Sequence, residues 1–117
     1  VMSITFKEEE GSFLMGVIAG KMTKTNKVGF VGGVDMELIQ KFEAGFIAGV
    51  KSVNPAAAAD LENRKNVKYA ASFSDVPKGY ELAKSLYNSG VDVIYHAAGG
   101  VGLGVFNAAS ELKKWAI

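Results

Sequence analysis

Cysteine is absent from the 117-residue sequence, and only one histidine is present. Without cysteine the chain can form no disulfide, no thiolate metal site and no cysteine nucleophile, although this absence does not distinguish an oxidising from a reducing compartment. The lone His96 has no second imidazole with which to build a metal cluster, so it is interpreted as a strand residue with its hydrogen bonds satisfied. The sequence therefore predicts neither a metal site nor a cofactor.

Neither sign of charge dominates, since 13 basic residues stand against 12 acidic ones and the charges are scattered along the chain. This balance argues against a nucleic-acid partner. No apolar run reaches membrane-spanning length, and the first residues lack the pattern of a signal peptide. With 49% of its residues apolar, the chain is expected to fold as one globular unit around one hydrophobic core.

Apolar runs of strand character alternate with longer segments of helical period, a pattern typical of βα units. It predicts an α/β fold with a doubly wound, mostly parallel sheet. Strands are expected at residues 3–6, 27–33, 67–73 and 91–98. Helices are expected at residues 13–22 and 36–53, from Pro77 to a cap at Gly90, and at residues 103–112, with residues 56–66 as a surface insertion or a short extra helical turn. Glycine and alanine inside the 36–53 segment predict that this helix lies very close to a neighbouring element.

Two glycine-rich loops are candidates for ligand binding, because ligands of open parallel sheets bind beyond the carboxyl ends of the strands. One loop holds Asp35 and Met36. The other holds Gly99, Gly100, Val101 and Gly102, and Phe42 could turn its ring toward the cleft between them. Glycines also make tight strand-to-helix turns without binding anything. Together these seven residues form the predicted binding edge.

Residues 97–104 admit more than one interpretation. A P-loop requires Lys followed by Ser or Thr after its last glycine, and Leu103 and Gly104 exclude it. A relaxed dinucleotide fingerprint fits Ala97, Gly99 and Gly102, and the stretch from His96 resembles quinone-reductase-type medium-chain dehydrogenases. A sugar or nucleoside contact without phosphate is the third alternative. No catalytic dyad or triad can be assembled.

Taken as a whole, the sequence resembles the basic membrane protein family of solute-binding lipoproteins. The resemblance rests on segments that follow the family's order, namely residues 3–14 (SITFKEEEGSFL), 24–33 (KTNKVGFVGG), 41–50 (KFEAGFIAGV), 72–75 (SFSD), 90–94 (GVDVI) and 97–104 (AAGGVGLG). The dehydrogenase alternative, by contrast, matches only from Val93 onward. Residues 56–66 depart from the family's pattern, in which fewer residues usually connect the flanking elements.

The resemblance implies one lobe of a type I periplasmic-binding-protein fold, with residues 1–10 as hinge strand and crossover and residues 11–117 as a truncated second lobe. It implies a non-enzymatic, extracytoplasmic component of an ABC importer, held by a lipid anchor absent from these residues. The implied partners are a purine nucleoside and the transporter permease. Both ends of the sequence are typical of a fragment, which predicts weak binding and possible self-association by the isolated chain.

Overall fold

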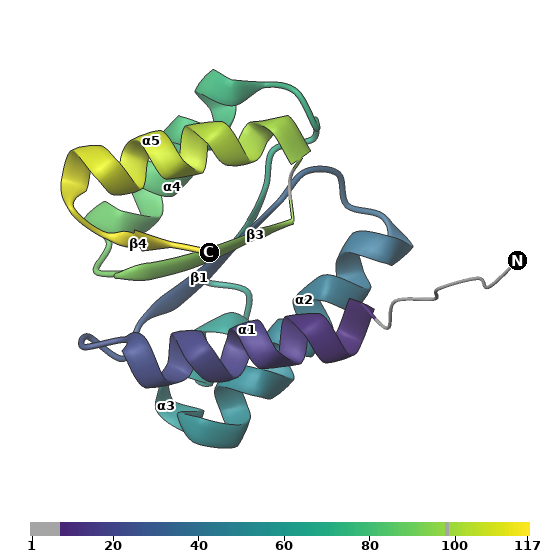
Figure 1. Ribbon diagram of the computed structural model, residues 1–117, viewed down its shortest axis with the longest axis vertical. Helices are drawn as coiled ribbons and strands as arrows, with labels where there is room; N and C mark the ends of the chain where they lie inside the picture. Colours follow the sequence, from purple (N-terminus) through teal and green to yellow (C-terminus); the bar gives the residue numbers. More distant parts are fainter. Residues whose placement is uncertain (1–7, 98) are drawn as a thin grey trace, which may run out of the picture.

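Four parallel strands form the sheet at the centre of the molecule (Figure 1). The computed structural model describes residues 8–97 and 99–117, so the strand expected at residues 3–6 lies outside the described part. The strands are β1 (Val28–Gly32), β2 (Val67–Tyr69), β3 (Val93–Ala97) and β4 (Trp115–Ala116), in the order β2-β1-β3-β4. Phe30 of β1 pairs with Val67 of β2 and with Tyr95 of β3. The predicted α/β fold with a parallel sheet is confirmed.

Helices cover both faces of this sheet. Figure 1 shows α1 (Glu8–Met22), α2 (Glu37–Val53) and α3 (Pro55–Glu62) on one face, with α4 (Val76–Asn88) and α5 (Gly102–Leu112) on the other. A short 3-10 turn, Gly99–Val101, leads from β3 into α5. The sheet is therefore doubly wound, as predicted.

Each face of the sheet has its own hydrophobic core. Strand β1 is buried along its whole length, with Val28 and Phe30 in the core under α1, α2 and α3, and Val31 in the core under α4 and α5. Alternation of side chains along a strand accounts for this division. The other fully buried large apolar side chains are Phe46, Val50, Leu61 and Val93 on the first side and Val91, Ile94, Val101 and Val105 on the second.

Helices α1 and α2 meet through glycine, as the small residues of the 36–53 segment predict. A Cβ atom on Gly49 would clash with the carbonyl oxygen of Phe13 and would lie 3.0 Å from the Cα of Gly16. A Cβ on Gly16 would in turn clash with the carbonyl oxygen of Phe46. Only glycine at both positions lets the two backbones approach this closely.

The residue 56–66 segment is more than a surface insertion. Asn54 ends α2 and caps α3, accepting a hydrogen bond from the Ala57 N–H at 3.2 Å. Ala57, Ala58 and Leu61 of α3 are fully buried and belong to the core under α2. The alternative of a short extra helical turn is therefore confirmed, and the segment is not confined to the surface, because Ala57, Ala58 and Leu61 pack inward whereas the charges that follow them stay in water.

Three other expectations need correction in their boundaries. Strand β2 ends at Tyr69 rather than at residue 73, because Ala71 adopts a left-handed conformation with φ of 59°. Strand β3 begins at Val93, since Asp92 accepts hydrogen bonds from Thr23 and Lys24 before the ladder starts. Helix α5 begins at Gly102 rather than at residue 103, and its buried face is formed by Gly104, Val105 and Ala108, whereas Leu103 and Phe106 are exposed.

Candidate functional site

A groove of about 430 Å³ lies at the carboxyl edge of the sheet, where β1 and β3 end. Strand β1 leads into α2 on one face, and β3 leads into α5 on the other. The chain therefore diverges between these two neighbouring strands, the position at which doubly wound folds bind ligands. The groove is lined by Leu38, Ile39, Phe42, Phe73, Tyr95, His96, Ala97 and Gly99.

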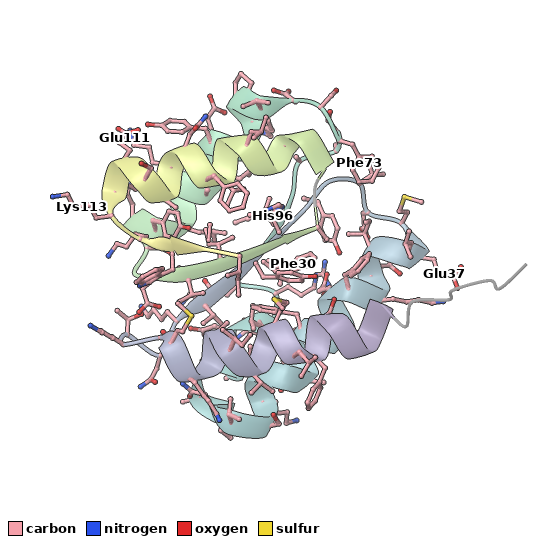
Figure 2. All side chains as sticks on the ribbon, viewed as in Figure 1. Phe30, Glu37, Phe73, His96, Glu111 and Lys113 are labelled. Carbon is pink, nitrogen blue, oxygen red and sulfur yellow. The ribbon has the colours of Figure 1, made fainter. Side chains whose placement is uncertain are left out.

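Two phenylalanines give the groove apolar walls. Phe42 comes from the second turn of α2, and Phe73 comes from the loop after β2, where its side chain is 41% exposed (Figure 2). Gly33 makes room for Phe73, since a Cβ at Gly33 would lie 2.5 Å from the Cε1 of that ring. An apolar wall of this kind suits a flat aromatic or other apolar ligand group.

Tyr95 holds one side of the groove in a fixed position. Its ring stacks on Phe46 with centroids 5.0 Å apart, and its hydroxyl is 3.2 Å from the hydroxyl of the buried Ser12. Phe30 packs against the same ring at 5.9 Å. Because the phenol is held by three elements, this side of the groove is pre-formed.

His96 adds an ionisable group to the groove. Its Nδ1 atom is buried and has no hydrogen-bond partner among the described residues, and its ring meets Phe106 edge to face at 4.8 Å (Figure 2). Gly102 lies directly against the ring, since a Cβ there would be 2.5 Å from Nδ1. Burial lowers the pKa of His96. The imidazole is therefore neutral at pH 7, and the interpretation that its hydrogen bonds are satisfied was wrong for Nδ1.

We expect the stability of the protein to fall through His96 as the pH is lowered below about 6.5. Because its pKa is lowered in the folded state, the unfolded chain binds the proton first as the pH falls, so the contribution present above pH ~6.5 is lost in acid. Urea unfolding at several pH values measures this loss, and NMR of the single imidazole measures the pKa. His96→Gln, which cannot titrate, is the control. If the free energy of unfolding of this variant changed with pH as it does in the original protein, the loss could not be assigned to His96.

The structure brings both predicted loops to the same edge of the sheet. The Gly33 N–H donates to the Ala97 carbonyl at 3.1 Å, which joins the ends of β1 and β3. Of the seven predicted residues, Phe42 and Gly99 line the groove. The remaining five, Asp35, Met36, Gly100, Val101 and Gly102, are not among the residues that line it.

Two of these five have evident structural roles. Val101 is fully buried, and its carbonyl oxygen packs on Gly79 of α4. Gly102 makes room for the His96 ring. Asp35 accepts a hydrogen bond from the Gln40 side chain at 2.8 Å, and Met36 is exposed at the start of α2. Ligand contact by any of the seven remains a prediction.

Sequence reasoning missed six residues of the groove, namely Leu38, Ile39, Phe73, Tyr95, His96 and Ala97. Phe73 was expected as the last residue of a strand and His96 as a strand residue near the end of its strand, and this position at the carboxyl ends of strands was the available signal. A polar cluster around the buried Glu43 was also missed. Glu43 accepts hydrogen bonds from Arg64 at 2.7 Å and from the Tyr69 hydroxyl at 2.6 Å, which joins α2 to the start and end of β2.

Within residues 8–97 and 99–117, no cluster of three or more His, Cys, Asp or Glu residues could hold a metal ion. None of the helices in the same part of the chain has the length and apolarity needed to cross a membrane. The groove thus offers aromatic walls, one neutral imidazole and backbone groups. This set can bind a ligand by stacking and hydrogen bonding.

Comparison with known proteins identifies the family. Residues 1–117 match the Bmp family, described as PnrA-like ABC transporter substrate-binding proteins. The chain belongs to this family. The match spans all the βα units, including the two that the dehydrogenase alternative leaves unexplained, and the comparisons give that alternative no support.

Two relatives illustrate the match of this Bmp-family chain. The CD4+ T-cell-stimulating antigen of Listeria monocytogenes is 59% identical over 97% of this chain and 30% of its own length. The ABC transporter nucleoside-binding protein BmpA of Lactococcus lactis is 48% identical over 97% of this chain and 31% of its own length. The chain thus spans about a third of the length of these relatives.

A solved structure gives the same result for the fold. The ABC transporter solute-binding protein of Conexibacter woesei superposes with a TM-score of 0.78 at 26% identity, over 93% of this chain and 34% of its own. The Bmp-family chain therefore has the fold of type I periplasmic-binding proteins.

Proposed function

We propose that this chain is one lobe of a two-lobed solute-binding protein that holds a purine nucleoside for an ABC importer. The apolar groove at the divergence of β1 and β3 carries the proposal, because its walls are aromatic and its position is that of a ligand site. The relative named as nucleoside-binding supports the nucleoside class. Residues 1–10 would form the hinge strand and crossover, and residues 11–117 the lobe.

Phe42 and Phe73 can stack on a purine ring, while His96 and the backbone of the Gly99 loop can hydrogen-bond to polar atoms of the ligand. The groove is open, so a second lobe would have to close over the opposite side of the ligand. Such a closure is a hinge motion, and the permease can recognise the closed state. Binding and release then require no bond to be made or broken, and in this proposal the protein acts outside the cytoplasm, held to the membrane by a lipid anchor.

Calorimetry on the two-lobed protein tests the ligand class. We expect inosine, guanosine or adenosine to bind with a dissociation constant of about 1 μM or lower, which corresponds to roughly 8 kcal/mol of binding free energy. NADPH is the control ligand and should give no heat of binding. Tight NADPH binding together with quinone reduction would contradict the proposal and restore the dinucleotide-binding alternative.

A substitution in the groove wall tests where the ligand lies. Phe42→Ala removes a partly buried ring from the α2 side of the groove, so we expect nucleoside affinity to fall about tenfold, the value of a lost stacking contact of roughly 1.5 kcal/mol. Leu14→Ala is the control, because Leu14 is 60% exposed on α1 and lies outside the groove. Equal affinities for Phe42→Ala and Leu14→Ala would place the ligand elsewhere.

A further inference from the structure

The first two turns of α2 form one wall of the groove. Leu38, Ile39 and Phe42 of this helix line the groove, and residues 95–97 at the end of β3 line it from the sheet. The N-cap residue Met36 makes no side-chain hydrogen bond to the start of the helix. The position of the wall therefore depends on the contacts that hold this end of α2 against the sheet.

Glu43 follows Phe42 on α2 and is a buried carboxylate. It is 7% exposed, and its two oxygens accept hydrogen bonds from different residues. Oε1 accepts from the Tyr69 hydroxyl at 2.6 Å, and Oε2 accepts from Arg64 at 2.7 Å. A buried carboxylate is costly unless it is bonded in this way, and an apolar side chain could fill the same position. The carboxylate therefore points to a role in orienting the helix rather than in packing alone.

Tyr69 connects this carboxylate to the strands that end at the groove. Its ring packs against Gly32, the last residue of β1, where a Cβ would lie 2.6 Å from the ring Cδ1 atom. Gly32 pairs with Ala97 of β3, which lines the groove. Burial, together with the Glu43 carboxylate, raises the pKa of Tyr69, so its hydroxyl keeps its proton and donates at physiological pH. The bond between Tyr69 and Glu43 thus links the strand ends to α2.

A purely structural role is the simpler interpretation of this cluster. Arg64 lies in the turn between α3 and β2 with φ of 63°, and its bond to Glu43 stabilises that turn. However, the Arg64 side chain is 54% exposed, so water screens this ion pair. Tyr69 is half-buried, and its bond leads to the groove rather than to the turn. A structural role alone predicts lower stability without Glu43 and unchanged ligand affinity of the folded protein.

We propose that Glu43 is a positioning residue of the groove. Its carboxylate ties α2 to Tyr69 and so fixes the place of Phe42 relative to the ends of β1 and β3. In the proposed function Phe42 contacts the ligand, and Glu43 acts on the affinity through Phe42. The effect on the ligand rests on that proposed function, whereas the anchoring of α2 does not.

Calorimetry with inosine on the two-lobed protein tests the effect on the ligand. Glu43→Ala should weaken binding about three- to tenfold, because the contact of the Phe42 ring is lost at least in part. Tyr69→Phe removes only the hydroxyl and should weaken binding in the same direction. Glu43→Gln keeps an oxygen that can accept from Tyr69 and should bind within about twofold of the original protein. Glu62→Ala, which breaks an exposed ion pair with Lys51, is the control and should leave binding unchanged.

A double substitution distinguishes positioning from stability. If Glu43 acts through Phe42, Glu43→Ala should change the affinity by less than about twofold in a protein that already carries Phe42→Ala. A merely structural role gives a different result, in which Glu43→Ala lowers the midpoint of urea unfolding and leaves inosine affinity unchanged. That result, or an equal effect of Glu43→Ala with and without the Phe42 ring, would overturn the proposal.

Hydrogen exchange of the ligand-free protein separates this inference from the proposed function. In Glu43→Ala the amides of residues 40–43 should exchange at least about tenfold faster relative to those of residues 46–50, which pack closely on α1. Glu62→Ala should leave this ratio unchanged. If the original protein bound no inosine, the proposed function would fail, and faster exchange at residues 40–43 would still support the anchoring of α2. An unchanged ratio would overturn the anchoring whether or not inosine binds.

Discussion

Gly49→Ala is expected to lower the free energy of unfolding by roughly 2 to 3 kcal/mol, the cost of overpacking a well-packed core. The added methyl group would clash with the carbonyl oxygen of Phe13 and would lie 2.9 Å from its carbonyl carbon and 3.0 Å from the Cα of Gly16. All three atoms belong to the α1 backbone, so no side-chain rotation can relieve the clash. Helix α1 would have to move away from α2, and the core between them would loosen.

Gly11→Ala on α1 is the matched control for this prediction. Among residues 8–97 and 99–117, no atom lies within 4 Å of a Cβ at Gly11, so the same substitution there should raise stability by up to about 1 kcal/mol through helix propensity. Urea unfolding followed by circular dichroism measures both changes. Two variants with equal stability would show that the close approach of α1 and α2 is not maintained in solution.

The main elements could be predicted from the sequence because local signals agreed with the final fold. Asp75 caps α4, because its side chain accepts a hydrogen bond from the Lys78 N–H at 3.1 Å. A capping residue shortly before Pro77 is a sequence signal for the start of this helix. Gly90 follows that helix with φ of 111°, a conformation that favours glycine. Errors arose where tertiary packing decided the outcome. Ala57 and Ala58 of α3 are buried because α2 and β1 lie against them.

The sequence could predict the position of the groove but not most of the side chains that line it. Parallel strands with helices on both faces determine which edge holds the loops, and this follows from the order of elements. The identity of the lining side chains depends on contacts between distant segments. Gly102 resembles part of a binding motif in the sequence, but in the structure it makes room for the His96 ring. Phe73 reaches the groove because β2 ends four residues earlier than expected.

The isolated 117-residue chain is expected to bind a nucleoside at least about 100-fold more weakly than the two-lobed protein. In the proposed function the groove would contact the ligand from one side only, so the ligand would keep much of its surface in water while losing its translational and rotational freedom. Few contacts would then remain to offset that loss. Calorimetry on the two proteins under identical conditions measures the ratio.

Self-association of the chain could also reduce binding, so it must be measured separately. Trp115 on the edge strand β4 is 59% exposed, and Leu14 and Leu103 are each 60% exposed. Exposed apolar side chains favour contact between copies, and so does the open edge of a strand such as β4. Light scattering should show oligomers that Trp115→Lys reduces and that Val53→Lys, on α2, leaves unchanged. If the monomeric Trp115→Lys chain bound nucleoside as tightly as the two-lobed protein, this lobe alone would form the site and the proposed clamp would be wrong.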